Sequence, residues 1–284
     1  MEISLFHETT YLYPEPVKES YSVVYLQPRT DTRQICSKYE LETTPPSRIF
    51  RYQDRFGNDV QHFTILPEHR GLTVTARSQI IAIGELRAQR PSAATRRQLD
   101  ADPEYEMLYE FKHPSPSVIY GEPLRRLLKE IGEPDKAIGD WYVHAGAYIH
   151  AHFAYDKNAT SVSTDVDEAV AARAGVCQDF AHVLIGLCRL AGVPARYVSG
   201  YLFSGEGRQV LGAEASHAWC EAYLPPHGWV GFDPTNDRLV DDHFVKIAFG
   251  RDYRDVSPVR GIYKGPSDSD LRVNVAVQSI APQQ

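Results

Sequence analysis

Hydrophobic periodicity changes once along this chain, and that change constrains the fold more than any other feature. Before residue 84, apolar side chains fall in short, strand-like runs separated by turns. From residue 122 onward they follow helical spacing. The first residues of this kind are Leu124, Leu127, Leu128 and Ile131. The pattern predicts a β-rich part followed by a part that begins with helices.

The first part predicts a small antiparallel β-sandwich. Its strand-like runs are rich in β-branched and aromatic residues and cover residues 3–13, 21–26, 39–43, 60–66 and 72–83. Turn-forming residues separate them, including Pro14 to Pro16 and the stretch 54–59. Short strands at this spacing are typical of a sandwich.

The second part predicts an α+β domain, with helices first and antiparallel strands afterwards. A weak helix is expected near residues 103–111, followed by helices over 122–131 and 135–153, a short one ending at 172, and one over 177–191. Thr164 or Asp165 can cap the short helix, and Gly192 can end the last one. Strands are expected at 195–203, 216–224, 229–232 and 271–280, the last closing a sheet.

The 284 residues suggest two domains at about 100–200 residues each. We therefore expect an N-terminal sandwich over residues 1–85, a linker over 86–121 and an α+β domain over 122–284. The sandwich is expected to support or gate a site in the second domain.

Cys177 is the strongest candidate for a reactive residue. It lies where a glycine-containing loop meets a predicted helix N-terminus. Unpaired N–H groups and the positive end of the helix dipole stabilise a thiolate at such a position. Gly175 allows a tight turn into the helix, and the same N–H groups can bind a developing oxyanion.

His217 and Asp233 can complete this chemistry. They lie on successive predicted strands whose turn is near residue 226. Their positions average to 225, so a hairpin brings them close, and their even separation places both on one face of the sheet. A neighbouring carboxylate would orient the imidazole and raise its basicity.

Each residue alone has an ordinary structural explanation. A helix cysteine is usually packed in a core, a strand histidine is usually structural, and Asp-Pro usually marks a turn. The order nucleophile, base and orienting carboxylate, each in a suitable context, favours a catalytic site.

At these residues the sequence resembles the transglutaminase-like superfamily. The motifs that carry the resemblance are AGVCQDFA at 174–181, GVPARYVSGY at 192–201, SHAWCEAY at 216–223 and GWVGFDPTN at 228–236. The DRFGN motif at 54–58 resembles the N-terminal domain of the bacterial group. GRDY at 250–253 and DVSPVRG at 255–261 resemble the C-terminal signature of that group.

The resemblance implies a papain-like fold and acyl-transfer chemistry. By motif position, Cys177 is the nucleophile, His217 the general base and then acid, and Asp233 its orienting group. The implied reaction is attack on a peptide or glutamine-type amide to form a thioester. Hydrolysis, as in a cysteine protease, is favoured because water is abundant and no amine-binding feature is visible. Transfer to an amine, as in a transglutaminase, is the closest alternative.

Other residues are candidates for the oxyanion hole or the pocket. Trp141 and Tyr155 precede Cys177, and either can supply a second oxyanion donor, although a core or rim position is the favoured explanation for both. Gln178 follows the cysteine, and Tyr201 and Trp219 can form pocket walls. Residues 251–253 either approach the cleft or form a structural ion pair.

Metal and disulfide chemistry are not favoured. Cys177, His182, His217 and Cys220 have zinc-ligand side chains. However, the first two are about 140° apart around a helix, and the last two lie on opposite faces of a strand. A continuous helix separates Cys177 from Cys188 by about 16 Å, whereas bridged Cα atoms lie within about 7 Å. No metal, cofactor or disulfide is expected.

Composition limits the partners. The formal charge is 30 − 37 = −7 and the pI is about 5.9, so a basic surface for nucleic acid or anionic membrane is not expected. No apolar run approaches 18 residues, and the start lacks a basic segment followed by a long apolar one. We expect a cytoplasmic protein acting on a peptide or protein amide. A binding or scaffolding module that has lost activity is a further alternative, and the oligomeric state is left open.

Overall fold

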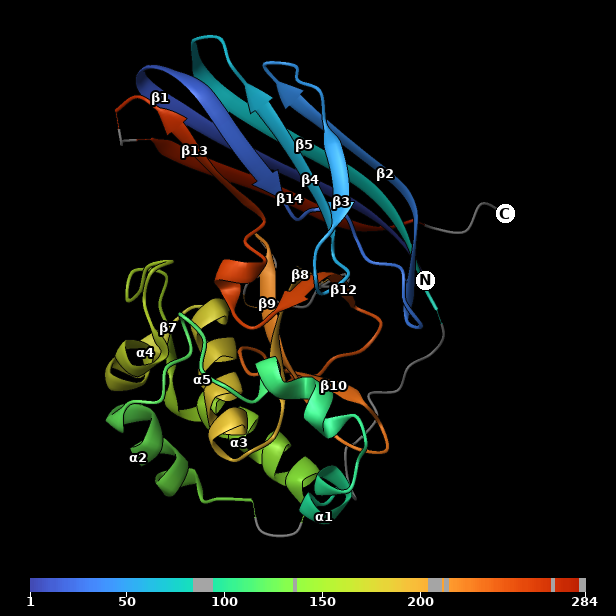
Figure 1. Cartoon of the computed structure of the whole chain (residues 1–284), viewed down its shortest axis with the longest axis vertical. Helices are drawn as coiled ribbons and strands as arrows, with labels where there is room; N and C mark the ends of the chain where they lie inside the picture. Colours follow the sequence, from blue (N-terminus) through green and yellow to red (C-terminus); the bar gives the residue numbers. More distant parts are fainter. Residues whose placement is uncertain (84–93, 135–136, 204–210, 212–214, 267–268, 281–284) are drawn as a thin grey trace.

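The computed structural model describes residues 1–83, 94–134, 137–203, 211, 215–266 and 269–280. A β-sandwich lies at one end of the molecule and a mixed helix-and-sheet part lies at the other (Figure 1). This arrangement confirms the α+β fold with an N-terminal antiparallel sandwich.

A single long strand, β1 (Glu2–Val24), runs through both sheets of the sandwich. Its first half pairs with β5 (His69–Ala82) and its second half with β4 (Asp59–Ile65). The prediction of two strands separated by a turn is therefore wrong. The prolines at 14 and 16 fall where the register with β5 shifts, between Leu12 and Val17. Proline is tolerated there because no ladder hydrogen bond needs its missing N–H.

Two further strands complete the N-terminal contribution. β2 (Gln34–Thr44) pairs with β5, and β3 (Phe50–Gln53), which was not predicted, pairs with β4. The sheets enclose a core of alternate apolar side chains. Its buried members include Leu41, Phe63, Ile65, Leu72 and Val74.

The last two strands belong to the sandwich and not to the helical part. β13 (Val259–Lys264) pairs with the second half of β1, and β14 (Asp270–Ile280) pairs with the first half. A strand near 271–280 was predicted correctly, but its placement with the residues from 122 onward was wrong. β13 and β14 join β1 along the edge that β4 and β5 leave open. An alternating apolar pattern shows which face of a strand is buried, but it does not show which edge the strand joins.

The helical part begins before residue 122. α1 (Arg96–Asp100) and the 3₁₀ helix η1 (Tyr105–Phe111) lie in the predicted linker, and Ala94, Leu99 and Val118 are fully buried in the main core. Most of this stretch therefore packs with the helices. Residues 84–93 lie outside the described part.

Four further helices follow close to their predicted positions. They are α2 (Glu122–Ile131), α3 (Ile138–His152), α4 (Val166–Ala172) and α5 (Cys177–Leu190). Asp165 caps α4 by accepting the N–H of Glu168, whose carboxylate accepts the N–H of Asp165 in return. The predicted start of α3 at residues 135–136 lies outside the described part.

A separate antiparallel sheet in the helical part carries α5 on one face. Its strands lie in the order β11 (Arg238–Leu239), β10 (Trp229–Asp233), β9 (His217–Tyr223), β8 (Ala195–Leu202) and β12 (Phe244–Gly250). β12 was not predicted, and it pairs with β8. Two short strands, β6 (Ala154–Tyr155) and β7 (Ala174–Gly175), pair beside the start of α5.

The two parts share one interface. Ile3, Leu5 and Ile80 of the sandwich are buried in the same cluster as α5. Asn58 donates its side-chain amide to the carbonyl of Phe249 and accepts the N–H of that residue, at 2.8 and 3.0 Å. The turn at 54–58 therefore anchors the sandwich to β12. Among the described residues, no helix is long and apolar enough to cross a membrane.

Candidate active site

Cys177 is the first residue of α5. The preceding Val176 is extended, and its N–H donates to the Asp179 carboxylate at 2.8 Å, which holds the start of the helix in place. Gly175 is required by close packing, because a Cβ there would lie 2.5 Å from an Asp179 oxygen. The first N–H groups of α5 have no partner within the helix and are directed towards incoming negative charge.

His217 and Asp233 meet across the β9–β10 hairpin. Trp229 pairs with Tyr223 in this hairpin, so Asp233 lies two positions from the residue opposite His217 and on the same face. The His217 Nε2 and Asp233 Oδ2 atoms are 2.7 Å apart, and both side chains are fully buried. Local alternation and hairpin register thus produce this pair.

The Asp233 carboxylate is held by further hydrogen bonds. Its Oδ1 accepts the N–H of Thr235 at 2.9 Å, and its Oδ2 accepts the side-chain amide of Asn236 at 2.8 Å. Burial opposes ionisation, but the charge and hydrogen bond of His217 hold the pKa of Asp233 below its usual range. The role of Asn236 was missed, although the turn that follows Asp-Pro contains it.

The imidazole of His217 is poised to hold a proton. Burial disfavours the charged ring, but the charge and hydrogen bond of Asp233, together with Cys177, raise the pKa of His217 to about 10. Its second nitrogen, Nδ1, is buried without a hydrogen-bond partner in the described part of the chain. Cys177 and His217 line the same cavity, so this nitrogen is available to take up a thiol proton.

The cavity beside Cys177 has a volume of about 350 Å³. Of the predicted pocket residues, Tyr155 and Gln178 line it. The wall residues that were missed include Lys157, Val162, Tyr197 and Ser199. Burial, followed by the nearby Cys177, raises the pKa of the Tyr197 hydroxyl well above its usual range, so this group stays protonated and can donate a hydrogen bond.

Three predicted pocket residues lie elsewhere. The Trp141 indole donates to the carbonyl of Gly132 at 2.6 Å, within the helical core. The Tyr201 hydroxyl bonds His7 of the sandwich at 2.8 Å. Trp219 packs against Phe244, on the side of the sheet opposite α5. Tyr201 lies further along β8 than the wall residues Tyr197 and Ser199, and Trp219 lies further along β9 than His217.

The segment at 251–253 contributes one wall residue. Tyr253 lines the cavity, and its N–H donates to His182 Nε2 at 3.1 Å. Burial lowers the pKa of His182 to about 4, so its ring is neutral and can accept this bond. Arg251 instead pairs with Asp255, and the Asp252 carboxylate accepts the N–H of Ser117.

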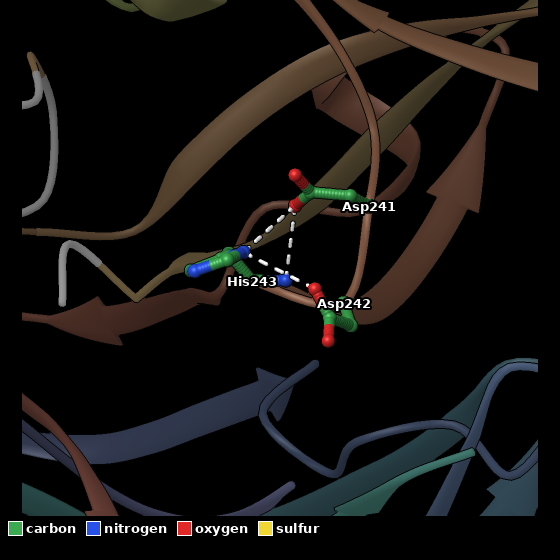
Figure 2. A group of neighbouring side chains, drawn as sticks. All are labelled: Asp241, Asp242 and His243. Atoms are coloured by element: carbon green, nitrogen blue, oxygen red, sulfur yellow. Dashed lines mark hydrogen bonds and ion pairs between the residues drawn. The ribbon is translucent and has the colours of Figure 1, made fainter. Parts of the chain in front are cut away.

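One group of metal-ligand side chains lies near the surface. Within the described residues, only Asp241, Asp242 and His243 bring three such atoms within 4.8 Å of one another (Figure 2). His243 Nδ1 lies 3.2 Å from a carboxylate oxygen of each aspartate, and Arg238 pairs with Asp241. These internal contacts account for the cluster. All four cysteines are free thiols.

We expect iodoacetamide to alkylate Cys177 rapidly at pH 6, where the charged His217 ring can stabilise a thiolate. In His217→Ala, rapid alkylation should begin only above about pH 8, where an unassisted thiol ionises. Mass spectrometry of the peptides locates the modification, and the fully buried Cys188 and Cys220 are internal controls that should not react. Equal rates of Cys177 alkylation at pH 6 in the wild type and in His217→Ala would contradict the expected pairing of the thiolate with the His217 ring.

Known proteins share both parts of this chain. Residues 126–234 match the transglutaminase-like superfamily, and residues 3–81 match the bacterial transglutaminase-like N-terminal region. An uncharacterized protein of Mycobacterium tuberculosis is 34% identical over 299 residues, which cover 95% of this chain and 90% of that protein. A protein-glutamine gamma-glutamyltransferase of Pseudomonas aeruginosa is 37% identical over 95 residues, which cover 31% of this chain and 14% of that protein.

A crystal structure from Cytophaga hutchinsonii, titled "Putative Cysteine Protease", has the same fold. It superimposes with a TM-score of 0.77 at 24% identity, covering 100% of this chain and 92% of that one. The likeness extends over the sandwich and the helical part together.

Proposed function

We propose that this chain, which belongs to the transglutaminase-like superfamily, is a thiol-dependent hydrolase that cleaves a peptide or glutamine-type amide. One observation carries the proposal. His217, which is buried and hydrogen-bonded to Asp233, lines the same cavity as Cys177 at the N-terminus of α5. A nucleophile, a base and an orienting carboxylate around an accessible cavity are the parts that acyl transfer requires.

The proposed reaction proceeds in two halves. His217 takes the thiol proton, and the Cys177 thiolate attacks the amide carbonyl. When the tetrahedral intermediate collapses, the carbon–nitrogen bond breaks, His217 returns its proton to the leaving amine, and a thioester remains. His217 then takes a proton from water, the hydroxide attacks the thioester, and the Cys177 thiol is restored as the carboxylic acid leaves.

The oxyanion is assigned to the N-terminus of α5. The backbone N–H of Cys177 is the first donor, since the leading N–H groups of a helix have no internal partner. Gln178, Tyr155 and the neutral Tyr197 hydroxyl line the same cavity and are candidates for the second. Asp233 keeps the imidazole in the orientation that leaves Nδ1 facing the cavity.

Transfer to an amine is the second candidate, favoured by the relative named as a protein-glutamine gamma-glutamyltransferase. Both reactions share the thioester and differ only in the group that resolves it. Lys157 lines the cavity, whereas no carboxylate does among the described residues, so no acidic group is present to attract a cationic amine. This charge pattern favours water as the acceptor.

The deciding experiment offers both acceptors together. Glutamine-containing peptides are incubated with the protein in ¹⁸O-labelled water, with and without a biotin-linked primary amine, and the products are weighed by mass spectrometry. We expect ¹⁸O in a new carboxylate with little biotin incorporation. Dominant biotin incorporation would instead establish transfer. If the wild type yields no more of either product than Cys177→Ala and a protein-free control, a non-catalytic binding module is the remaining explanation.

A further inference from the structure

We propose that a second cavity, lined by cationic side chains, binds a phosphate monoester or diphosphate group. This cavity has a volume of about 600 Å³ and lies between the 29–33 segment of the sandwich and the sheet that carries β12. Its lining includes Arg29, Arg33, Arg196 and Lys246. No part of the proposed acyl-transfer chemistry uses these residues.

The cavity lies on the opposite face of the sheet from α5. Ala222 of β9 packs in the core cluster that includes α5, and alternation turns the neighbouring Glu221 to the other face. Arg196 of β8 is the direct cross-strand partner of Glu221 and shares that face. A ligand bound here would therefore be separated from Cys177 by the sheet.

The floor of the cavity holds an unbalanced set of charges. The side chains of Arg196 and Lys246 are only 10% and 13% exposed, and both pair with the Glu221 carboxylate, which is 4% exposed. Two cations against one carboxylate leave a net charge of 2 − 1 = +1. An excess charge held away from water is costly unless a counter-ion offsets it.

The rim adds to the imbalance. Arg29 Nη1 is fixed by the carbonyl of Gly57 and by Asn58 Oδ1, at 2.7 and 2.9 Å. The Arg33 guanidinium makes no hydrogen bond or ion pair with the part of the chain that the structure describes, and Asp31 is the single carboxylate in the lining. The four cationic side chains of the lining and the carboxylates of Asp31 and Glu221 together carry a net charge of 4 − 2 = +2. The formal charge of the whole chain is −7.

The neighbouring carboxylates are engaged by groups other than the Arg33 guanidinium. Asp241 and Asp242 line an adjacent cavity that Arg33 and Lys246 also line. There the two aspartates contact His243 (Figure 2), and Asp241 also pairs with Arg238. Asp31 Oδ1 is already engaged, since it accepts the N–H groups of Arg33 and Gln34. Among the described residues, the Arg33 guanidinium therefore remains the cation of this lining that is free to bind an anion.

The side-chain types favour a phosphate over an apolar or aromatic ligand. Guanidinium groups bind phosphate oxygens in pairs, and lysine adds a point charge. The Arg196 guanidinium lies over the Trp229 and Phe249 rings, at 4.0 and 3.7 Å from their centroids. Because Arg196 covers these ring faces, recognition depends on charge and not on stacking.

Calorimetric titration with inorganic pyrophosphate, at constant ionic strength, tests the proposal. We expect saturable binding to the wild type and to Cys177→Ala alike, so the result is independent of the proposed hydrolase activity. Arg33→Ala should weaken binding about tenfold, the loss typical of one hydrogen bond to a charged group. The Arg33 side chain has no hydrogen bond or ion pair with the described residues, so this variant should fold normally. The matched control is Arg97→Ala, which removes an exposed arginine on α1.

Two results would overturn the proposal. One is a titration in which pyrophosphate releases or absorbs no more heat than sodium chloride does at equal ionic strength. The other is binding that Arg33→Ala and Arg97→Ala weaken equally, which would indicate general charge attraction. Citrate provides the chemical comparison, and citrate binding as tight as pyrophosphate binding would overturn the assignment to phosphate.

Discussion

Replacing Cys177 with alanine is expected to abolish turnover and leave the fold intact. The thioester cannot form without the sulfur, so kcat/KM should fall by roughly 10³- to 10⁶-fold. The side chain is small and lies at the cavity wall, so its removal should cost only about 1 kcal/mol of unfolding free energy. Turnover of the substrate found in the peptide experiment and urea unfolding measure the two effects separately.

Substitutions at His217 and Asp233 should lower kcat/KM less than Cys177→Ala does, and in a definite order. His217→Ala removes the proton carrier, whereas Asp233→Ala removes only a group that orients it, so the loss in kcat/KM should be smaller for Asp233→Ala. Cys36→Ala, in the sandwich strand β2, is the control that should retain full activity. Full activity in Cys177→Ala, or a reversed order of His217 and Asp233, would reject the assigned roles.

Removing the Glu221 carboxylate is expected to destabilise the fold strongly. In Glu221→Ala, the buried Arg196 and Lys246 charges would face each other without a counter-charge. Breaking a buried charge cluster in this way typically costs about 3–5 kcal/mol. The shift in urea midpoint at an unchanged m-value measures the loss. Glu130→Ala breaks the half-exposed pair with Arg173 and is the control, for which a much smaller loss is expected.

The same cluster predicts a dependence on pH. Burial opposes ionisation of Glu221, but Lys246 and Arg196 outweigh it and lower its pKa to about 2. The folded value lies below the unfolded value of about 4.3. The stabilisation is therefore fully present above about pH 5 and is lost as the pH falls through about 2. Glu221→Gln should lack this acid-sensitive part of the stability, and an identical acid profile in both proteins would contradict the cluster's role.

Much of the candidate site followed from local sequence patterns. Helical spacing after residue 177 placed Cys177 at the start of α5, as observed. Hairpin symmetry and strand alternation placed His217 beside Asp233. In the structure, His217 Nε2 and Asp233 Oδ2 are 2.7 Å apart. Both inferences depend on the spacing of apolar residues within one or two adjacent helices or strands. This spacing specifies local geometry strongly.

The pocket walls were harder to predict from the same patterns. Tyr201 and Tyr197 lie on the same face of β8, yet Tyr197 lines the cavity and Tyr201 bonds His7 of the sandwich. Trp219 is two residues from His217, but its ring packs against Phe244. Which end of a strand meets a cavity depends on the elements packed over it, and no single segment encodes that information.

By itself, the sequence determined the positions of the four main helices, the helix start at Cys177 and the facing of His217 towards Asp233. The tertiary structure alone decided that β1 passes through two sheets, that β13 and β14 return to the sandwich, and that β12 joins β8. It also brought Arg29 and Arg33 beside Arg196 and Lys246. The physical reason is that alternation specifies which face of a strand is buried, whereas the choice of edge partner depends on the packing of the whole chain.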